Sequence, residues 1–344
     1  MPKPSGAVAV AFFAAATLAA PATAQEFYQG KQIRLIVSSA AGGGYDAVAR
    51  LLSRFMPRYI SGAPSFVVVN MPGASGLVAA NHFVNVAEKD GTVLAVLNRF
   101  AAIMPVLGND QAKFKTEDLQ WLGTTASYSD NAYLLVIRSA LPHKSIDDMR
   151  NTATPLNIGT SGTDVPAILK EALGINLKLI TGYKGSEEME LAFERGEIDG
   201  HTTAYTNILQ RHPTWFPSGF IRPMLQFGRA DRLAPIKDVP TAREAARSPA
   251  DRALIEFAEL PLLLARPLAA PPGVPAARVR MLRDAFAKTM ADPEHKAESE
   301  RLNLELAPKS GEEVTAIIAG LTTVDRAVVQ RYIKALGGKM PSGN

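Results

Sequence analysis

Short apolar runs alternate with segments whose apolar residues recur every three or four positions along most of this chain. The first run is IRLIV at 33–37. The helical face predicted after it is made of Val48, Leu51, Leu52 and Phe55. Proline inside an α-helix removes a backbone hydrogen bond and breaks or kinks the helix, so this helix is expected to end near Pro57. The pattern therefore predicts a buried strand followed by an amphipathic helix.

The same alternation continues to residue 97 and returns in the middle of the chain. Further strands are predicted at 66–70, 92–97, 155–160 and from 177 onward. Three helices are predicted between them. One has an apolar face of Leu77, Ala80, Phe83, Val84 and Ala87. Another has a face of Ile168, Leu169, Ala172 and Leu173, with Gly174 as its C-terminal cap, and the third spans 186–195. Strands that alternate with helices form mainly parallel sheets with right-handed connections. The predicted fold class is α/β, with two domains of similar design.

Two apolar runs rich in leucine are expected to join these domains. They lie at 131–142 and 259–271. Each is interpreted as an apolar strand that ends in an arginine, a small residue or proline, and then proline. We interpret them as a matched pair, one leaving the first domain and one returning to it. This predicts that 25–131 together with 263–344 form lobe 1 and that 132–262 form lobe 2.

Helical patterns return after the second connection. They place apolar residues at 279–290 and 314–324. Ser310 and Glu313 have the spacing of a capping box at the start of the latter helix, and Gly337 and Gly338 are expected to close it.

Residues 1–24 have the features of an export signal. Lys3 gives a positive start, 7–20 is an uncharged apolar run, and Ala22 and Ala24 have the A-x-A spacing that signal peptidase recognises. The run is shorter than the roughly 20 residues that a membrane-spanning helix needs. We therefore expect cleavage after Ala24 and export. The sequence contains no cysteine, so a disulfide framework is excluded.

Composition narrows the function further. A chain of 344 residues with 47% hydrophobic side chains is long enough to bury a substantial core in two domains. The net charge of +4 comes from scattered lysines and arginines without a basic run, which gives nucleic-acid binding little support. The five histidines, at 82, 143, 201, 212 and 295, lack the spacing of metal ligands, so no metal site is predicted.

Small, glycine-rich turns precede three of the predicted helices, at 42–44, 72–76 and 161–163. The first N–H groups of a helix have no partner inside the helix and lie at the positive end of its dipole, which favours an anion. In an open parallel sheet, the loops that follow the strands form the crevice in which ligands bind. These turns therefore predict a small anion held between two lobes.

Two enzymatic alternatives fit less well. Gly42, Gly44 and Ala47 approximate the dinucleotide-binding pattern G-x-G-x-x-G, but Asn70 stands where the acidic residue at the end of the second strand is expected. GTSGT at 159–163 and GASGL at 73–77 are not the G-x-S-x-G of a hydrolase. A nucleotide-dependent oxidoreductase that uses the Gly42–Gly44 loop remains the alternative function.

Several segments taken in order resemble one known family. They are AAGGGYDAVAR, VVVNMPGASGLVAANHF, EKDGTVLAV, LPHKSIDDM, LNIGTSGTD, GYKGSEEMELAFERGEIDG and IKDVPTAREA, and the similarity runs from about residue 27 to 335. The chain resembles the Bug family of extracytoplasmic solute receptors, the binding proteins of tripartite tricarboxylate transporters. The resemblance implies a periplasmic, two-lobed fold of the type II binding-protein kind, with a cleft that closes on a small carboxylate. It also implies no catalysis, no cofactor, and a large and a small membrane permease subunit as partners; we expect a monomer.

The resemblance also carries site residues onto this chain. In lobe 1 the matching positions are Ala41 (where the family has proline), Gly42, Gly43, Gly44, Tyr45 and Asp46 in the first loop and Gly73 and Ala74 in the second. In lobe 2 they are Ser161, Gly162, Thr163, Tyr183 and Asp199. The histidine common after the lobe 2 glycine-serine segment is replaced by 164–166, which are Asp, Val and Pro.

Other candidates follow from their positions at predicted strand ends. Asn98 and Arg99 come directly after the strand at 92–97, and Thr202 offers a hydroxyl at the inner edge of lobe 2. Arg99 either pairs with a ligand carboxylate or forms a salt bridge within the protein. Asp46 is explained most simply as a carboxylate in the first turn of its helix.

Overall fold

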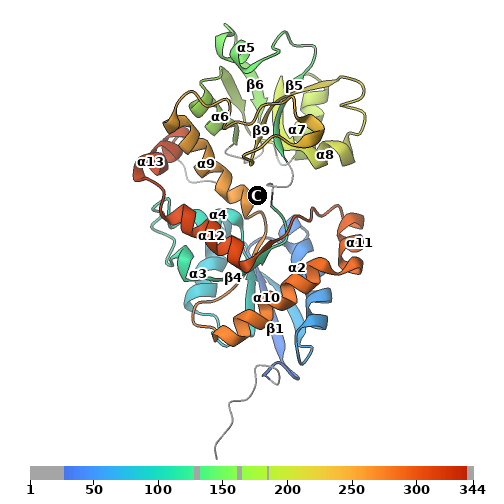
Figure 1. Cartoon of the computed structure of the whole chain (residues 1–344), viewed down its shortest axis with the longest axis vertical. Helices are drawn as coiled ribbons and strands as arrows, with labels where there is room; N and C mark the ends of the chain where they lie inside the picture. The colour runs from blue at the N-terminus through green and yellow to red at the C-terminus, as the bar shows by residue number, and fades with distance from the viewer. Residues whose placement is uncertain (1–26, 128–131, 161–164, 184–185, 339–344) are drawn as a thin grey trace, which may run out of the picture.

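The computed structural model describes residues 27–127, 132–160, 165–183 and 186–338. These residues form two β-sheets flanked by helices, one in each of two lobes stacked along the long axis of the molecule (Figure 1). We call the sheet of six strands sheet A and the sheet of five strands sheet B. The elements around sheet A are lobe 1, and those around sheet B are lobe 2.

Sheet A has the strand order β11-β4-β10-β3-β1-β2. Its strands are β1 (Gln32–Val37), β2 (Ser65–Asn70), β3 (Val93–Val96), β4 (Gln120–Thr124), β10 (Pro267–Ala270) and β11 (Lys309–Ser310). Its helices are α2 (Gly44–Phe55), α3 (Leu77–Asn85), α4 (Arg99–Ile103), α10 (Ala276–Ala291), α11 (Pro293–Arg301) and α12 (Gly311–Thr322), with 3₁₀ turns η1 (Met56–Tyr59), η2 (Ala74–Gly76) and η3 (Thr116–Asp118). The apolar strands and the helical face predicted at the beginning of the chain are confirmed.

Sheet B has the strand order β7-β6-β8-β5-β9. Its strands are β5 (Tyr133–Arg138), β6 (Leu156–Gly159), β7 (Leu177–Ile180), β8 (Gly200–Ala204) and β9 (Ile221–Phe227). The helices around it are α5 (Ile146–Asn151), α6 (Val165–Leu173), α7 (Ser186–Glu194), α8 (Tyr205–Arg211), α9 (Pro249–Leu263) and α13 (Arg326–Ala335), with the 3₁₀ turn η4 (Ala234–Ile236). Gly174, with φ +66°, ends α6 as predicted, and its N–H donates to the carbonyl of Lys170.

The second connecting run begins as a helix, which corrects one prediction. Residues 259–263 form the last part of α9, and only 267–270 form a strand. Pro261 lies inside the helix. A continuous apolar run has no period that separates a buried strand from a buried helix, and here the buried helix is the outcome.

The C-terminal segment also departs from the predictions. The capping box of Ser310 and Glu313 is present, but its helix α12 ends at Thr322. A second helix, α13, starts after the cap residue Asp325 and packs against α9 and α6, so Gly337 and Gly338 follow α13 and not α12. The sequence prediction places 263–344 in lobe 1, and α13, within this segment, contacts helices of lobe 2.

An apolar core runs through the junction between the lobes. One cluster of buried side chains includes Trp121 of β4, Ile158 of β6 and Leu254 of α9, which belong to different lobes. A second cluster fills the face of sheet A against α2 and α10, and a third fills the face of sheet B against α7 and Trp215. The lobes are therefore joined by packed side chains as well as by the chain itself.

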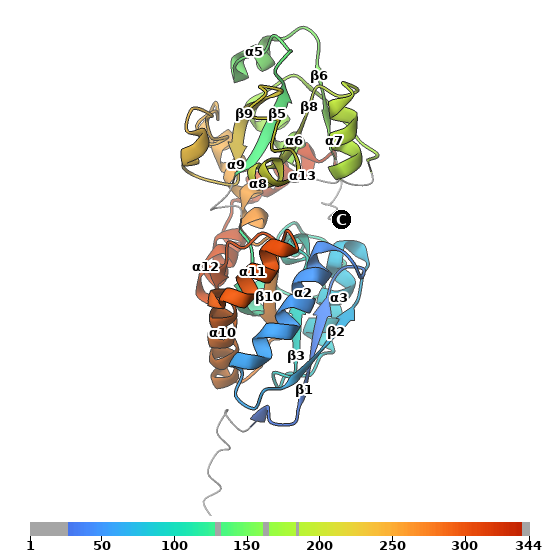
Figure 2. The ribbon, with the colours of Figure 1, turned by 90° about the vertical axis from the view of Figure 1, so that its right-hand side faces the viewer.

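The directions of the strands show which edge of sheet A faces sheet B, and which edge of sheet B faces sheet A. In sheet A, β1 to β4 run one way and β10 and β11 run back. In sheet B, β6 to β9 run one way and β5 runs back. We call the edge where the majority strands end the carboxyl edge. The chain passes from Thr124, at the end of β4, to Tyr133, at the start of β5, so it joins the two carboxyl edges directly. β1 accordingly runs from the far end of lobe 1 toward lobe 2 (Figure 2).

Candidate functional site

The first glycine turn lies at the carboxyl edge of sheet A and is open to solvent. Residues 41–44 are exposed, and α2 begins at Gly44 with Gly43 as its N-cap. The first bond of the helix is donated by the N–H of Ala47 to the carbonyl of Gly43, over 2.9 Å. The N–H groups of the preceding helical residues have no partner within the helix and lie at its positive end. This arrangement suits an anion.

The carboxylate of Asp46 holds the backbone of this turn in place. Its buried carboxylate accepts from the N–H of Gly42 at 2.9 Å, from Nε of Arg50 at 2.8 Å and from Nδ2 of Asn70 at 3.0 Å. The hydrogen bond from Arg50 is the largest cause that lowers the pKa of Asp46 to about 2. A carboxylate held ionised repels a second carboxylate, and the N–H of Gly42 is already used. The interpretation of Asp46 as a first-turn carboxylate is confirmed. Ligand contacts of Asp46 and of the Gly42 N–H stay predictions.

The second glycine loop has a left-handed backbone through four successive residues. The φ angles are +131° at Gly73, +46° at Ala74, +54° at Ser75 and +93° at Gly76. Gly73 and Ala74 are exposed, whereas Gly76 is buried. A Cβ on Gly76 would lie 2.9 Å from Cβ of Asn98, so this glycine packs directly against the end of β3. Alanine and serine rarely adopt such angles, so the backbone at Ala74 and Ser75 is strained, at a cost of order 1–3 kcal/mol per residue.

Asn98 and Arg99 organise the end of β3. Oδ1 of the buried Asn98 accepts from the N–H of Phe100 at 2.8 Å and caps α4. The backbone N–H of Asn98 donates to Oγ of Ser38, and the N–H of Arg99 donates to the hydroxyl of Tyr45 at 3.2 Å. The structure thus brings Tyr45, Asn98 and Arg99 together at the carboxyl edge of sheet A, with the Asn98 amide oxygen engaged as a cap.

The predicted residues of lobe 2 are divided. Tyr183 follows β7 at the carboxyl edge of sheet B, where its half-buried ring packs beside the cluster of Phe193, and burial raises the pKa of its hydroxyl. Thr202 is buried in β8, two residues before that strand ends. Ser161, Gly162 and Thr163 lie outside the described residues.

Asp199 lies at the opposite edge of sheet B. It precedes β8, and its carboxylate pairs with Arg138 at 3.1 Å and accepts from the N–H of Asn157 at 2.8 Å. Arg138 ends β5 and Asn157 lies near the start of β6, so all three are at the outer edge. The length of β8 separates Asp199 from Tyr183 and Thr160. This carboxylate holds strand beginnings together, and its position at the outer edge does not support the ligand contact of Asp199, which stays a prediction.

The sequence reasoning missed two residues of the carboxyl edge of sheet A. Ser38, directly after β1, is buried and accepts from the N–H of Asn98. Arg266, directly before β10, places its guanidinium beside Gly44. A single arginine inside the apolar stretch 262–270 is a signal that was available in the sequence.

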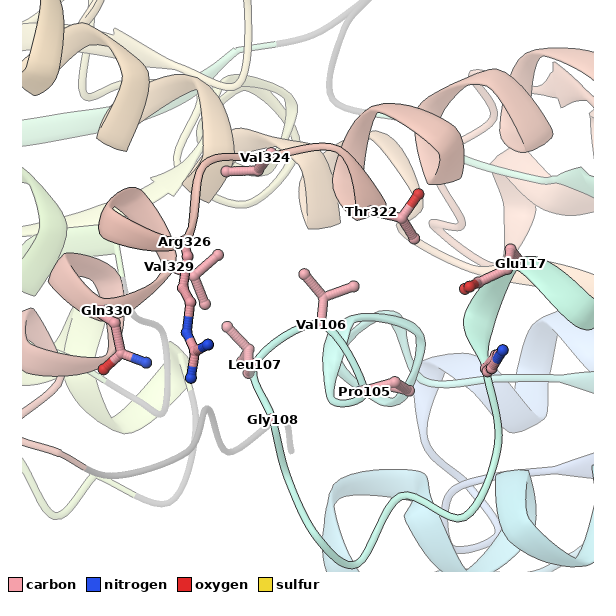
Figure 3. Close-up of a pocket in the computed structure, with 11 residues that line it drawn as sticks. Pro105, Val106, Leu107, Gly108, Glu117, Thr322, Val324, Arg326, Val329 and Gln330 are labelled. Carbon is pink, nitrogen blue, oxygen red and sulfur yellow. The ribbon is translucent and has the colours of Figure 1, made fainter.

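A separate groove of about 430 Å³ lies where α12 gives way to α13. It is lined by Thr322 of α12, by Arg326, Val329 and Gln330 of α13, by Val324 between the helices, by the loop 105–108, and by Lys115 and Glu117 (Figure 3). None of the predicted site residues that the structure describes lines it. Across the described ranges, no group of three or more histidine and acidic side chains is arranged to hold a metal, and no helix is both long and apolar enough to span a membrane.

A family model describes most of the chain. Residues 48–335 match the tripartite tricarboxylate transporter family receptor, TctC. The chain belongs to this receptor family. The resemblance noted from the sequence motifs is thereby confirmed.

Curated relatives of the receptor are distant. It is 25% identical over 285 residues to a UPF0065 protein of Bordetella pertussis, covering 80% of this chain and 81% of that protein. It is 29% identical over 187 residues to a UPF0065 protein of Agrobacterium vitis from the TAR-I ttuE-ttuC' intergenic region. That match covers 52% of each protein, so the receptor spans about half the length of this relative.

Solved structures place the fold. A TctC solute-binding protein from Polaromonas superposes with a TM-score of 0.68 at 20% identity, covering 91% of the receptor and all of that chain. MatC from Rhodopseudomonas palustris, solved with malate, gives 0.56 at 20% identity, covering 89% and 99%. An R. palustris protein solved with adipate gives 0.58 at 21% identity, covering 90% and 98%. The two-lobed periplasmic binding-protein fold predicted for the receptor is confirmed.

Proposed function

We propose that the receptor works in the periplasm, where it captures a small organic carboxylate between its lobes and delivers it to the membrane permease subunits of a tripartite tricarboxylate transporter. The observation that carries this proposal is the pair of facing carboxyl edges, with the exposed start of α2 at one of them. Malate and adipate in two structural neighbours support a dicarboxylate as the ligand class. Export by a signal at 1–24 and a monomeric state are part of the same proposal.

In the proposed mechanism the carboxylate meets the start of α2 first. N–H groups of Gly43 to Asp46 and the loop at Gly73 and Ala74 then surround one end of the ligand. Charge-assisted hydrogen bonds contribute roughly 1.5–3 kcal/mol each, so a few of them suffice for micromolar binding, which corresponds to about −8 kcal/mol. No covalent step is involved.

Lobe 2 then closes over the ligand by rotation at the junction. Tyr183 and Thr202, with Ser161, Gly162 and Thr163, contact the rest of the ligand in the closed state. A ligand that touches both lobes favours this state and increases its population. The permease subunits then recognise the closed form.

Substitution of Gly43 tests the site with little risk to the fold. A Cβ at Gly43 meets nothing nearer than the carbonyl oxygen of Ala40 at 3.8 Å, so Gly43→Val is expected to fold normally. The added side chain covers the start of α2 and should weaken carboxylate binding at least tenfold. Calorimetry with malate, adipate and citrate measures the affinity, and circular dichroism checks the fold.

Two results would contradict the proposal. One is wild-type affinity in a folded Gly43→Val variant. The other is a thermal-shift screen in which nucleotides raise the melting temperature and carboxylates do not, which would favour the alternative of a nucleotide-dependent oxidoreductase.

A further inference from the structure

Arg266 is a single charge within a buried apolar stretch of the chain. Leu264 and Ala265 before it and Pro267 and Leu268 after it are buried, and Arg266 itself is half-buried. This stretch leads from α9 into β10 and therefore passes through the junction between the lobes. Apolar side chains would satisfy the packing there, so the arginine calls for a separate explanation.

The backbone holds Arg266 firmly at the carboxyl edge of sheet A. Its N–H donates to Oγ1 of Thr124 at 3.2 Å, and its carbonyl accepts from the N–H of Thr125 at 3.4 Å. The next carbonyl, that of Pro267, accepts from the N–H of Leu97 at 3.0 Å. Arg266 is thus fixed between the ends of β3 and β4.

The side chain of Arg266 reaches the start of α2. Its Nη2 lies 3.4 Å and its Nε 3.8 Å from the position that a Cβ on Gly44 would occupy. Gly44 has an ordinary helical backbone, since its φ is not in the left-handed region. The absence of a side chain at Gly44 therefore leaves room for the guanidinium beside the first helical residue.

The guanidinium has no partner in the described part of the chain: no hydrogen bond or ion pair joins it to any of those residues. Other arginines of low exposure are paired. Arg243, with 19% of its side chain exposed, lies 2.6 Å from Glu259, and Arg283, with 24% exposed, lies 2.8 Å from Glu312. Removing a charge from water is costly unless a partner compensates. A ligand carboxylate beside Gly44 would be such a partner.

We propose that Arg266 binds a carboxylate group of the ligand through its planar fork of N–H donors, next to the N–H groups at the start of α2. The proposal rests on the proposed function and adds to it a fixed positive charge. Arginine and carboxylate pair bidentately, and the pair is stronger than a bond to a neutral oxygen. The receptor is therefore selective for an ionised carboxylate over the neutral amide of the same shape.

Substitutions at Arg266 test this role directly. Arg266→Gln removes the charge, and Arg266→Lys keeps the charge but loses the fork. Arg283→Gln is a matched control, because Arg283 is a half-buried arginine of the same lobe with its own partners, Glu312 and the carbonyl of Trp121. Affinities of each purified protein for malate, adipate, citrate and benzoate are measured by calorimetry, and melting temperatures are measured without ligand.

The expected pattern separates binding from structure. Arg266→Gln should weaken the binding of every acid that the wild type binds by about tenfold to a hundredfold, and Arg266→Lys should weaken it less. Without ligand, Arg266→Gln should melt at or above the wild-type temperature, whereas Arg283→Gln should melt lower with unchanged affinity.

Wild-type affinity in Arg266→Gln would overturn the role of Arg266 and leave the proposed function intact. A fall in ligand-free melting temperature as large as in Arg283→Gln, without loss of affinity, would show a structural role and overturn the proposal as well. If the wild type bound none of the four acids, the proposed function itself would fail.

Discussion

The two facing edges of the receptor are built from different chemistry. At the carboxyl edge of sheet A, Asp46, Arg50 and Arg266 bring charges to the start of α2, and Asp46 fixes the loop through three hydrogen bonds. At the carboxyl edge of sheet B, the described residues that follow β6, β7 and β8 include Thr160, Tyr183 and Tyr205, which are neutral. In the proposed mechanism, lobe 1 therefore holds the charged end of the ligand, and lobe 2 contacts the remainder through hydroxyl and aromatic groups.

The first prediction concerns the packing of the second glycine loop at the carboxyl edge of sheet A. Gly76→Ala places a Cβ 2.9 Å from Cβ of Asn98 and 3.3 Å from Ser38 in a backbone with φ +93°. Clash and strain together should lower the free energy of unfolding by about 2–4 kcal/mol. Urea unfolding measures the change.

Gly42→Ala is the matched control for Gly76→Ala. Gly42 has a similar φ of +86°, but a Cβ there meets nothing within 4 Å. Only the strain of about 1 kcal/mol should remain. Equal losses in the two variants would contradict the close packing of the second loop against β3.

The second prediction concerns the interior of lobe 2, which contains a histidine held neutral. His201 is fully buried against Phe193 and Trp215, neither ring nitrogen has a hydrogen-bond partner among the described residues, and burial lowers its pKa to about 4. The unfolded chain takes up this proton below its ordinary pKa near 6.5, so stability is lost as the pH falls from about 6.5 through 4.

His201→Phe should abolish this dependence. Phenylalanine has similar size, suits the edge-to-face contacts and removes the group that titrates. Between pH 7 and pH 5 the wild type should lose about 2 kcal/mol more stability than the variant. Urea unfolding at the two pH values gives the comparison, and an equal loss in both proteins would show that His201 is not responsible.

The third prediction returns to lobe 1 and has the smallest effect. The pKa of Asp46 is lowered to about 2, so its contribution is complete above the ordinary pKa near 4 and is lost as the pH falls toward 2. Asp46→Asn should therefore cost about 1–2 kcal/mol at pH 7 and much less near pH 2. Thermal unfolding across this range measures it. A constant loss at every pH would mean that shape, not charge, matters at this position.

How far the sequence predicts this molecule depends on the kind of signal. Periodicity located most strands and helices, because alternating burial leaves a repeating pattern, as in α2 and β1. It did not predict the helix at 259–263, where apolar residues follow Glu259 without a helical period. It also placed the end of α12 too far along, because a second helix follows at once.

The site is less accessible to sequence reasoning. Motifs located the glycine turns, since their backbone requirements limit residue type. They did not reveal which polar groups are used internally, as Asp46 and Asp199 are, because the partners Asn70 and Arg138 are distant in sequence. Arg266 was missed for the same reason: only the folded chain brings it beside Gly44.

The groove between α12 and α13 offers a place to measure the proposed rotation of the lobes. α12 packs on sheet A and α13 on helices of lobe 2, and only 323–325 link them. Gly108 and Gln330 line that groove together (Figure 3), so the proposed rotation of one lobe against the other should alter the spacing between them. A pair of fluorophores at these two positions would report changes in the angle between the lobes through energy transfer, from positions away from the proposed ligand site.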